Sequence, residues 1–300
     1  MKVIRAKVLG FCTGVRRAVE MAWAVSKESG FSEAGRVYTF GPLIHNTNVL
    51  QSLKERGVTC LEENDIPTAE KNATIIIRAH GISPVIEREI VQQGFTVVDA
   101  TCPHVKVSQS KARSYAEKGY VLFLAGEEKH AEIEGVRGYA QDGFPVTAIP
   151  RCFVVSNPFE AEAAASELHG NQPNAKTALI GQTTIMAEEY RAMAERISRF
   201  FPSLEVMDSV CGATQKRQKA LLELCAITDA VIVVGSRESA NTKRLLSLAK
   251  ELGKPAWLTE SPADIPREIG NYATVGISAG ASTPDNLVDE VEKALTCQPD

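Results

Sequence analysis

The chain has 300 residues, of which 44% are hydrophobic and 6% aromatic, and this is enough apolar material for two or three domains with buried cores. A formal net charge of -4 gives no overall attraction to nucleic acid or to anionic membranes. The N-terminal residues contain no apolar signal segment, and no later run approaches 18 uncharged residues, so we expect a cytoplasmic protein with no membrane partner. Seven cysteines in such a protein favour thiolate chemistry over a disulfide framework.

Three of the seven cysteines occur in one local pattern, in which a β-branched-rich run precedes the cysteine and a helix-forming segment follows it. These cysteines are Cys12, Cys102 and Cys211. The strand-like runs cover residues 3–9, 95–98 and 204–208, and the helical segments cover residues 15–26, 105–117 and 214–227. Three thiols at three strand-to-helix junctions indicate one shared centre built by three similar units.

The first third of the chain places two histidines just beyond predicted strands. A strand over residues 36–40 leads into His45, and a strand over residues 74–77 leads into His80. The helix that follows Cys12 has apolar residues at a 3.6-residue period, and Gly30 is its predicted end. In parallel α/β sheets ligands bind at the carboxyl edge of the strands, so both histidines are candidate binding residues.

The middle third repeats this arrangement with different side chains. A predicted strand over residues 120–125 leads into a loop that contains His130 and Glu132, and a strand over residues 177–180 leads to Thr183. A histidine, a carboxylate and a hydroxyl are therefore expected at the same kind of sheet edge.

The last third places polar side chains before helices. A predicted strand over residues 230–234 leads into Ser239 and Asn241, and a strand over residues 274–277 leads into Ser282. Together the elements predict an α/β protein with three similar units and mainly parallel sheets. The predicted units cover residues 1–100, 101–208 and 209–300.

Two kinds of chemistry are indicated by these residues. Loops of Gly, Ser, Thr and Asn before helices offer backbone N–H groups and hydroxyls at the positive end of a helix dipole, which together with the two histidines suits phosphate. The chain contains no Walker pattern and no Gly-x-Gly-x-x-Gly, so a small phosphorylated compound is favoured over a nucleotide. The three thiols suit a soft metal centre, either an iron–sulfur cluster or zinc.

The motifs around these residues, in their order along the chain, resemble the IspH/LytB family of 4-hydroxy-3-methylbut-2-enyl diphosphate reductases. The resemblance extends from about residue 3 to residue 284. The matching motifs are Gly-Phe-Cys12-Thr-Gly-Val-Arg-Arg-Ala-Val, Gly-Pro-Leu-Ile-His45-Asn, Arg-Ala-His80-Gly, Asp-Ala-Thr-Cys102-Pro, His130-Ala-Glu132, Gln-Thr183-Thr, Val-Cys211-Gly-Ala-Thr and Gly-Ser-x-x-Ser239-x-Asn241-Thr.

The resemblance implies a trefoil of three α/β units around a 4Fe-4S cluster that Cys12, Cys102 and Cys211 hold, with the fourth iron open to substrate. It implies the last step of the non-mevalonate isoprenoid pathway, in which two electrons and two protons convert the substrate into isopentenyl and dimethylallyl diphosphates. A ferredoxin or flavodoxin is the expected electron donor.

The resemblance also implies the roles of individual side chains. Glu132 would donate the proton to the leaving hydroxyl, Thr183 would orient that hydroxyl, and His130 would support the network. The implied diphosphate-binding residues are His45, His80, His130, Ser239, Asn241 and Ser282.

One position departs from the family pattern, and one assignment depends on the resemblance alone. Ala240 stands where the family often has a second serine, which predicts one hydroxyl fewer for the diphosphate unless Ser236 or Thr242 supplies it. On spacing alone the proton donor could equally be another nearby carboxylate. These rivals of Glu132 are Glu127, Glu128 and Glu134.

Two other classes of protein are compatible with the same residues. Three cysteines and a histidine could form a closed structural zinc site, which would contain no sulfide. An iron–sulfur sensor could bind the diphosphate without converting it, and it would need no acid at Glu132. We expect structural or surface roles for the remaining cysteines and histidines. These are Cys60, Cys152, Cys225, Cys297, His104 and His169.

Overall fold

The computed structural model describes residues 1–28, 36–62, 65–66, 73–144 and 152–297. The chain divides into two compact units, each assembled from separate stretches. Unit 1 consists of Met1–Arg16, Ile44–Glu55 and Gly212–Asp300, and unit 2 consists of Arg17–Leu43 and Arg56–Cys211.

Strands and helices alternate along most of the chain, as expected for parallel sheets. In chain order the elements are β1 (Lys2–Arg5), α1 (Thr13–Glu28), β2 (Val37–Phe40), α2 (Thr47–Glu55), β3 (Val58–Leu61), β4 (Thr74–Ile77), α3 (Pro84–Gln92), β5 (Thr96–Asp99), α4 (Pro103–Glu117), β6 (Val121–Ala125), α5 (Ala131–Gly143), β7 (Cys152–Val155), α6 (Pro158–Asn171), β8 (Thr177–Gly181), α7 (Ala187–Ser198), β9 (Glu205–Val206), α8 (Gly212–Cys225), β10 (Ala230–Val234), α9 (Ala240–Glu251), β11 (Ala256–Thr259), β12 (Thr274–Ala279) and α10 (Asp285–Thr296).

The described strands form three four-stranded parallel sheets with the same topology. One sheet lies in unit 1 and two lie in unit 2, and the three sheets with their helices confirm the predicted fold of three similar α/β parts. The strand orders are β1-β12-β10-β11, β5-β4-β2-β3 and β9-β8-β6-β7, and every recorded pairing is parallel. In each sheet three consecutive strands follow one path: the first (β10, β2 or β6) is an inner strand, the second pairs on one side of it and the third on the other. Each sheet therefore has a switch point between its first and third strands, where ligands bind in open α/β sheets.

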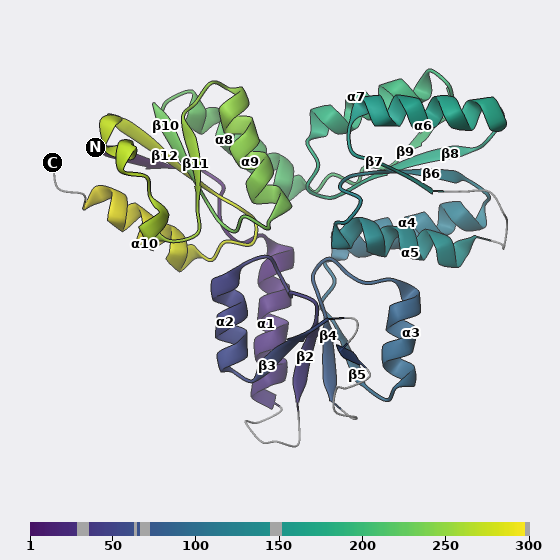
Figure 1. Cartoon of the computed structure of the whole chain (residues 1–300), viewed down its shortest axis with the longest axis horizontal. Helices are drawn as coiled ribbons and strands as arrows, with labels where there is room; N and C mark the ends of the chain where they lie inside the picture. The colour runs from purple at the N-terminus through teal and green to yellow at the C-terminus, as the bar shows by residue number, and fades with distance from the viewer. Residues whose placement is uncertain (29–35, 63–64, 67–72, 145–151, 298–300) are drawn as a thin grey trace. The chain divides into compact units, whose positions relative to one another are not determined.

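The sheet of unit 1 has helices on both faces. Helix α10 packs on one face and helices α8 and α9 pack on the other (Figure 1). The five residues of the inner strand β10 are all buried. On one face Ala230, Ile232 and Val234 form an apolar core with β12 and with the α10 residues Leu287, Val288 and Val291. A strand that is covered on both faces must be apolar throughout, which is why β10 shows no alternation.

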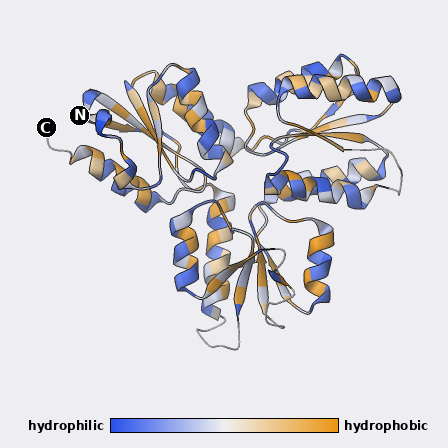
Figure 2. Cartoon of the chain, in the orientation of Figure 1, coloured by the Kyte–Doolittle hydropathy of each residue, from blue (hydrophilic) through white to orange (hydrophobic). Residues whose placement is uncertain are grey.

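Unit 2 contains the other two sheets. In the sheet around β6, helices α4 and α5 cover one face and helices α6 and α7 cover the other (Figure 1). Figure 2 shows the hydrophobic colour concentrated on the central strands, and all five residues of β6 are buried. In the sheet around β2, helix α3 packs against β5 and places Ile90 in the core.

Most predicted elements lie within a few residues of their expected positions. The strand predicted before Cys12 is shorter than expected, since β1 ends at Arg5, and the strand predicted before Cys211 is reduced to the two residues of β9. Gly30, the predicted end of the first helix, lies outside the described residues. The loop predicted around Glu132 is wrong, because Glu132 lies in the first turn of α5.

The strands that precede Cys12, Cys102 and Cys211 are β1, β5 and β9. Each of them is an edge strand, added to three consecutive strands that form the rest of its sheet. Strand β1, at the start of the chain, pairs with β12 near its end, whereas β5 and β9 pair with strands that directly precede them in sequence. The boundaries near residues 100 and 208, which divide the chain into three predicted parts, remain predictions.

Among the described residues, no helix is both long and apolar enough to cross a membrane.

Candidate functional site

The backbone N–H group of each predicted metal-binding cysteine donates to a carbonyl oxygen just beyond the third strand of a sheet. Cys12 donates to Ala281 over 3.1 Å and Cys102 donates to Ala79 over 2.9 Å. Cys211 donates to Thr183 over 3.0 Å. These three contacts are topologically equivalent, because the acceptors follow β12, β4 and β8. The repeated sheets therefore fix each cysteine beside the loop that carries Ser282, His80 or Thr183.

All three thiols are half-buried, and each lies just before a helix or at its first residues. Cys102 is the N-cap residue of α4, and the N–H group of Val15 in α1 points at Cys12 Sγ over 3.4 Å. Helix N-terminal N–H groups favour an anion, and a metal-bound thiolate is such an anion. The donor set of three accessible sulfur atoms therefore fits an iron–sulfur group chemically.

Glu132 is the buried carboxylate among the four candidates for the proton donor. Its side chain is 1% exposed, whereas Glu127 is half-buried and Glu128 and Glu134 are exposed. Thr183 donates its N–H group to Glu132 Oε1 over 2.7 Å and its hydroxyl to Glu132 Oε2 over 2.8 Å. Both carboxyl oxygens are therefore held in fixed directions by one residue.

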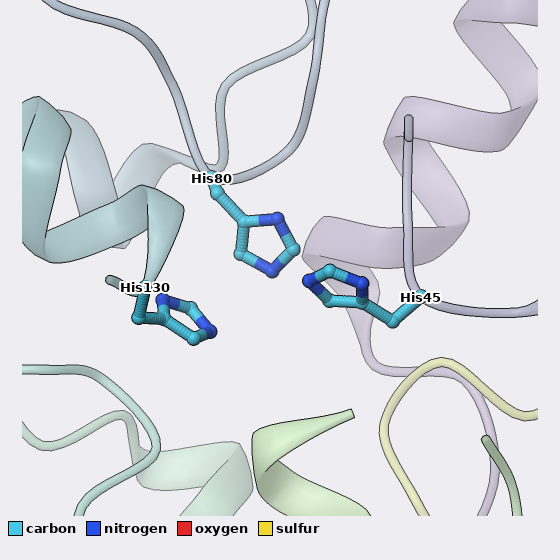
Figure 3. Close-up of side chains that lie close together, drawn as sticks. All are labelled: His45, His80 and His130. Atoms are coloured by element: carbon cyan, nitrogen blue, oxygen red, sulfur yellow. The ribbon is translucent and has the colours of Figure 1, made fainter. Parts of the chain in front are cut away.

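His130 caps the helix that carries Glu132. Its Nδ1 atom accepts the N–H group of Glu132 over 3.2 Å, which assigns the hydrogen of the neutral ring to Nε2. The rings of His80 and His130 meet edge to face with their centroids 5.2 Å apart (Figure 3). Unit 2 thus brings four predicted site residues together around the start of α5.

The start of α9 in unit 1 carries the second group of predicted site residues. Ser239 is the N-cap residue, and its hydroxyl oxygen accepts the N–H group of Thr242 over 3.4 Å. Asn241 is 4% exposed, and its Nδ2 atom is buried without a hydrogen-bond partner among the described residues. A buried amide without a partner is costly, so this group is suited to a ligand that supplies acceptors.

The loop after β12 carries the remaining predicted residue of unit 1. Ser282 is 6% exposed and donates its hydroxyl to the carbonyl oxygen of His45 over 3.0 Å. This bond fixes the backbone at His45, whose half-buried side chain is labelled in Figure 3. Ser282 and His45 thus belong to one local arrangement even though 237 positions separate them in sequence.

Ala240 and its two possible substitutes, Ser236 and Thr242, all lie at or near the start of α9. Ala240 is 3% exposed and is the first helical residue after Ser239. Ser236 already accepts the N–H group of Glu238, and Thr242 is fully buried against the backbone of Gly280. A Cβ atom on Gly280 would lie 2.1 Å from the Thr242 hydroxyl, so this hydroxyl is enclosed by the protein.

Three residues that we expected to have structural or surface roles lie in the core or on the surface. Cys225 is 3% exposed within α8, which confirms its place in the core. His104 and His169 are exposed, in the first turn of α4 and the last turn of α6 respectively.

The sequence interpretation missed Arg217, which is 3% exposed and donates to the Gly10 carbonyl. A charged residue at a core-facing position of α8 was the available signal.

The switch-point topology explains which loops contribute to the site. The predicted residues follow the first strands β2, β6 and β10 or the third strands β4, β8 and β12. These strands are neighbours in each sheet, and the loops that leave them diverge to opposite faces. One topological rule, applied three times, therefore accounts for all the predicted residues other than the cysteines.

The comparisons with known proteins agree on one family. The family model described as LytB protein matches residues 3–296. A relative from Treponema denticola, named 4-hydroxy-3-methylbut-2-enyl diphosphate reductase, is 43% identical over 98% of this chain and 99% of its own length. A relative of the same name from Desulfovibrio desulfuricans is 38% identical over 99% of both chains.

Two solved structures share the fold. The E-1-hydroxy-2-methyl-but-2-enyl-4-diphosphate reductase from Plasmodium falciparum has a TM-score of 0.87 and 26% identity, covering 99% of this chain and 89% of that one. A structure titled (E)-4-hydroxy-3-methyl-but-2-enyl diphosphate reductase, the terminal enzyme of the non-mevalonate pathway, has a TM-score of 0.68 and 33% identity over 99% of both chains. With the family model matching nearly its whole length, this chain belongs to the LytB family.

Proposed function

We infer that the chain is an oxidoreductase that reductively removes the hydroxyl of 4-hydroxy-3-methylbut-2-enyl diphosphate. The products are isopentenyl and dimethylallyl diphosphates, and the reaction is the last step of the non-mevalonate route to isoprenoids. The alcohol takes up two electrons and two protons and releases water, so the C–O bond is exchanged for a C–H bond. The family match and the names of the relatives support this reaction.

The buried Glu132–Thr183 pair is the observation that carries the mechanism. Hydroxide is a poor leaving group, so the oxygen needs a proton as the C–O bond breaks. The carboxyl of Glu132 is shielded from water and fixed at both oxygens by Thr183, which suits it to hold that proton at one defined position. His130 orients the same carboxylate-bearing turn through its bond to the Glu132 N–H group.

The family carries an iron–sulfur cluster, and we assign it as a 4Fe-4S cluster held by Cys12, Cys102 and Cys211. Three thiolates leave one iron without a protein ligand, and when bound the cluster supplies single electrons together with that Lewis-acid position. The equivalent strand-end settings of the three cysteines support this assignment. Cys225 is excluded from the ligand set because it lies on α8 and is buried in the protein core.

The diphosphate is assigned to the polar group around the helix starts. Its ligands would be His45, His80, His130, Ser239, Asn241 and Ser282. The N-terminal N–H groups of a helix and its dipole favour an anion, and the buried Asn241 Nδ2 atom provides an additional donor. Binding energy from this remote, unreacting group would hold the hydroxyl end against Glu132.

We propose that the electrons come from a separate donor protein, since the sequence contains no flavin motif of its own. A ferredoxin or flavodoxin in the cytoplasm fits this requirement. Each delivers one electron at a time, which matches the chemistry of a single cluster.

The decisive experiment is a count of iron and acid-labile sulfide on protein purified without oxygen, followed by an anaerobic assay with the diphosphate. About four of each per chain, with reduction of the substrate, would agree with the proposal. Zinc without sulfide, on protein that cannot be reconstituted, would make the three cysteines a structural site. A full cluster with tight diphosphate binding and no turnover would indicate a sensor.

A further inference from the structure

Arg217 has a place in unit 1 that the proposed reaction does not use. It lies in the second turn of α8 and is 3% exposed. Its guanidinium donates to two carbonyl oxygens, to Ala213 over 2.9 Å and to Gly10 over 2.5 Å. Gly10 lies two residues before Cys12, and Ala213 lies two residues after Cys211. One side chain thus connects the turn before Cys12 to the first turn of α8, the helix that follows Cys211.

The turn at Gly10 allows little movement of the carbonyl that Arg217 binds. Gly10 has φ +74°, a conformation that favours glycine, and a Cβ atom there would lie 2.9 Å from Asp285 Oδ1. Two residues later, Cys12 is tied through its N–H group to Ala281. The Gly10–Cys12 turn is therefore held at two points, by Arg217 at the Gly10 carbonyl and by Ala281 at the Cys12 N–H group.

We propose that Arg217 is a positioning residue of the iron–sulfur centre, which it serves by fixing the turn of Cys12 against the first turn of α8 through the Gly10 and Ala213 carbonyl oxygens. This inference rests on the assignment of these cysteines in the proposed function. The planar guanidinium reaches two acceptors from one side chain, which an ammonium group at a single point cannot do in the same way.

The charge of Arg217 has a second consequence for the centre. Burying a guanidinium costs free energy, because its positive charge is removed from water. A buried positive charge beside the cysteine turns stabilises the more negative, reduced state of a cluster relative to the oxidised state. Arg217 therefore acts on two measurable properties, the retention of the cluster and its reduction potential.

The test compares Arg217→Gln and Arg217→Lys with wild-type protein after anaerobic reconstitution. Lys216→Gln is the matched control, since Lys216 is the exposed neighbour on the same helix. Iron and sulfide are measured over time in the presence of a chelator, and the midpoint potential is measured by titration. We expect both Arg217 variants to lose the cluster at least about fivefold faster, because neither retains the two-carbonyl contact.

The reduction potential separates the two variants. In Arg217→Gln the ratio of reduced to oxidised cluster at a fixed potential should fall about tenfold, which corresponds to a shift of about 59 mV to more negative values for a one-electron couple. Arg217→Lys retains the charge, so its ratio should stay within about twofold of wild type. Lys216→Gln should match wild type in both measurements.

Two results would overturn the inference. One is an Arg217→Gln protein that retains its cluster as long as wild type at the same potential. The other is loss of folding in the apoprotein of both Arg217 variants, seen by circular dichroism, which would assign Arg217 to the fold.

Turnover by wild-type protein is a separate readout. A wild-type cluster without reduction of the diphosphate would reject the proposed function while the retention and potential still decide the role of Arg217. Wild-type protein that takes up no iron and sulfide would reject both.

Discussion

The starts of α5 and α9 occupy equivalent positions in two sheets, yet their chemistry is different. Each follows the first inner strand of its sheet, and each begins with an N-cap residue, an alanine and a buried polar residue. In α5 that polar residue is Glu132, and both of its oxygens accept from Thr183. In α9 it is Asn241, and its Nδ2 atom has no partner among the described residues.

This comparison shows that one topology can place two different kinds of polar side chain at equivalent helix starts. Both side chains lie in the first turn of a helix that follows an inner strand next to the switch point of its sheet, where ligands bind in open α/β sheets. A carboxyl group with its bonds already made is suited to hold and deliver a proton, whereas an amide with an unused donor is suited to bind an incoming anion. Under the proposed function, the residue type at this one position would assign the start of α5 to the reacting end and the start of α9 to the diphosphate end.

The largest expected effect comes from replacing Glu132, the proposed proton donor at the start of α5. Glu132→Gln should lower turnover by about a hundredfold to a thousandfold, because an amide cannot protonate the leaving oxygen. Binding of the substrate should change by less than about twofold, since the amide keeps the shape of the side chain. Anaerobic single-turnover kinetics and a binding titration check both values.

Glu134→Gln is the control for this variant, because Glu134 is an exposed carboxylate on the same helix. It should reduce the substrate at the wild-type rate. Near wild-type turnover by Glu132→Gln would remove Glu132 from the role of proton donor.

The next effect concerns the diphosphate end. His45→Ala should weaken binding of the diphosphate by about thirtyfold, because hydrogen bonds to charged groups contribute about 1.5–3 kcal/mol. The rate at saturating substrate should change much less. Calorimetric titration with inorganic diphosphate measures the dissociation constant without the reaction, and an unchanged constant would exclude His45 from the anion site.

Asn241→Ala tests the unused donor at the start of α9. We expect about tenfold weaker diphosphate binding, because one hydrogen bond to a charged group is lost. The apoprotein should not become less stable, because Asn241 Nδ2 has no partner among the described residues. Thermal unfolding checks the stability, and Asn286→Ala, at an exposed position of α10, is the control. A clear loss of apoprotein stability with unchanged binding would mean that Asn241 supports the fold.

The smallest effect sharpens the comparison at the alanine that the two helix starts share. Ala240→Ser adds a hydroxyl at the first position of α9, and diphosphate binding should become about twofold to fivefold tighter if the hydroxyl faces the anion. The corresponding change in α5, Ala131→Ser, should leave diphosphate binding unchanged. Equal effects at both positions would mean that the two helix starts are not specialised.

The chain's local patterns determined a large part of this protein. Apolar runs ended by polar residues located the strands, and the recurrence of Cys12, Cys102 and Cys211 at such ends indicated three similar units. Short-range signals are informative here, because apolar runs and turn-forming residues are local features of the sequence. The element at Glu132 was missed because His130, an uncommon N-cap residue, starts α5.

Only the tertiary structure decided which strands are neighbours and which carboxylate is buried. Pairing of β1 with β12 joins residues from opposite ends of the chain, and no local pattern specifies such a partner. Glu132 differs from Glu134 in burial and in its bonds to Thr183, which lies 51 positions away. Arg217 likewise acquires its place from a carbonyl 207 positions away. Burial and long-range hydrogen bonds are properties of the packed sheets, so the sequence alone proposed the candidate residues and the fold distinguished among them.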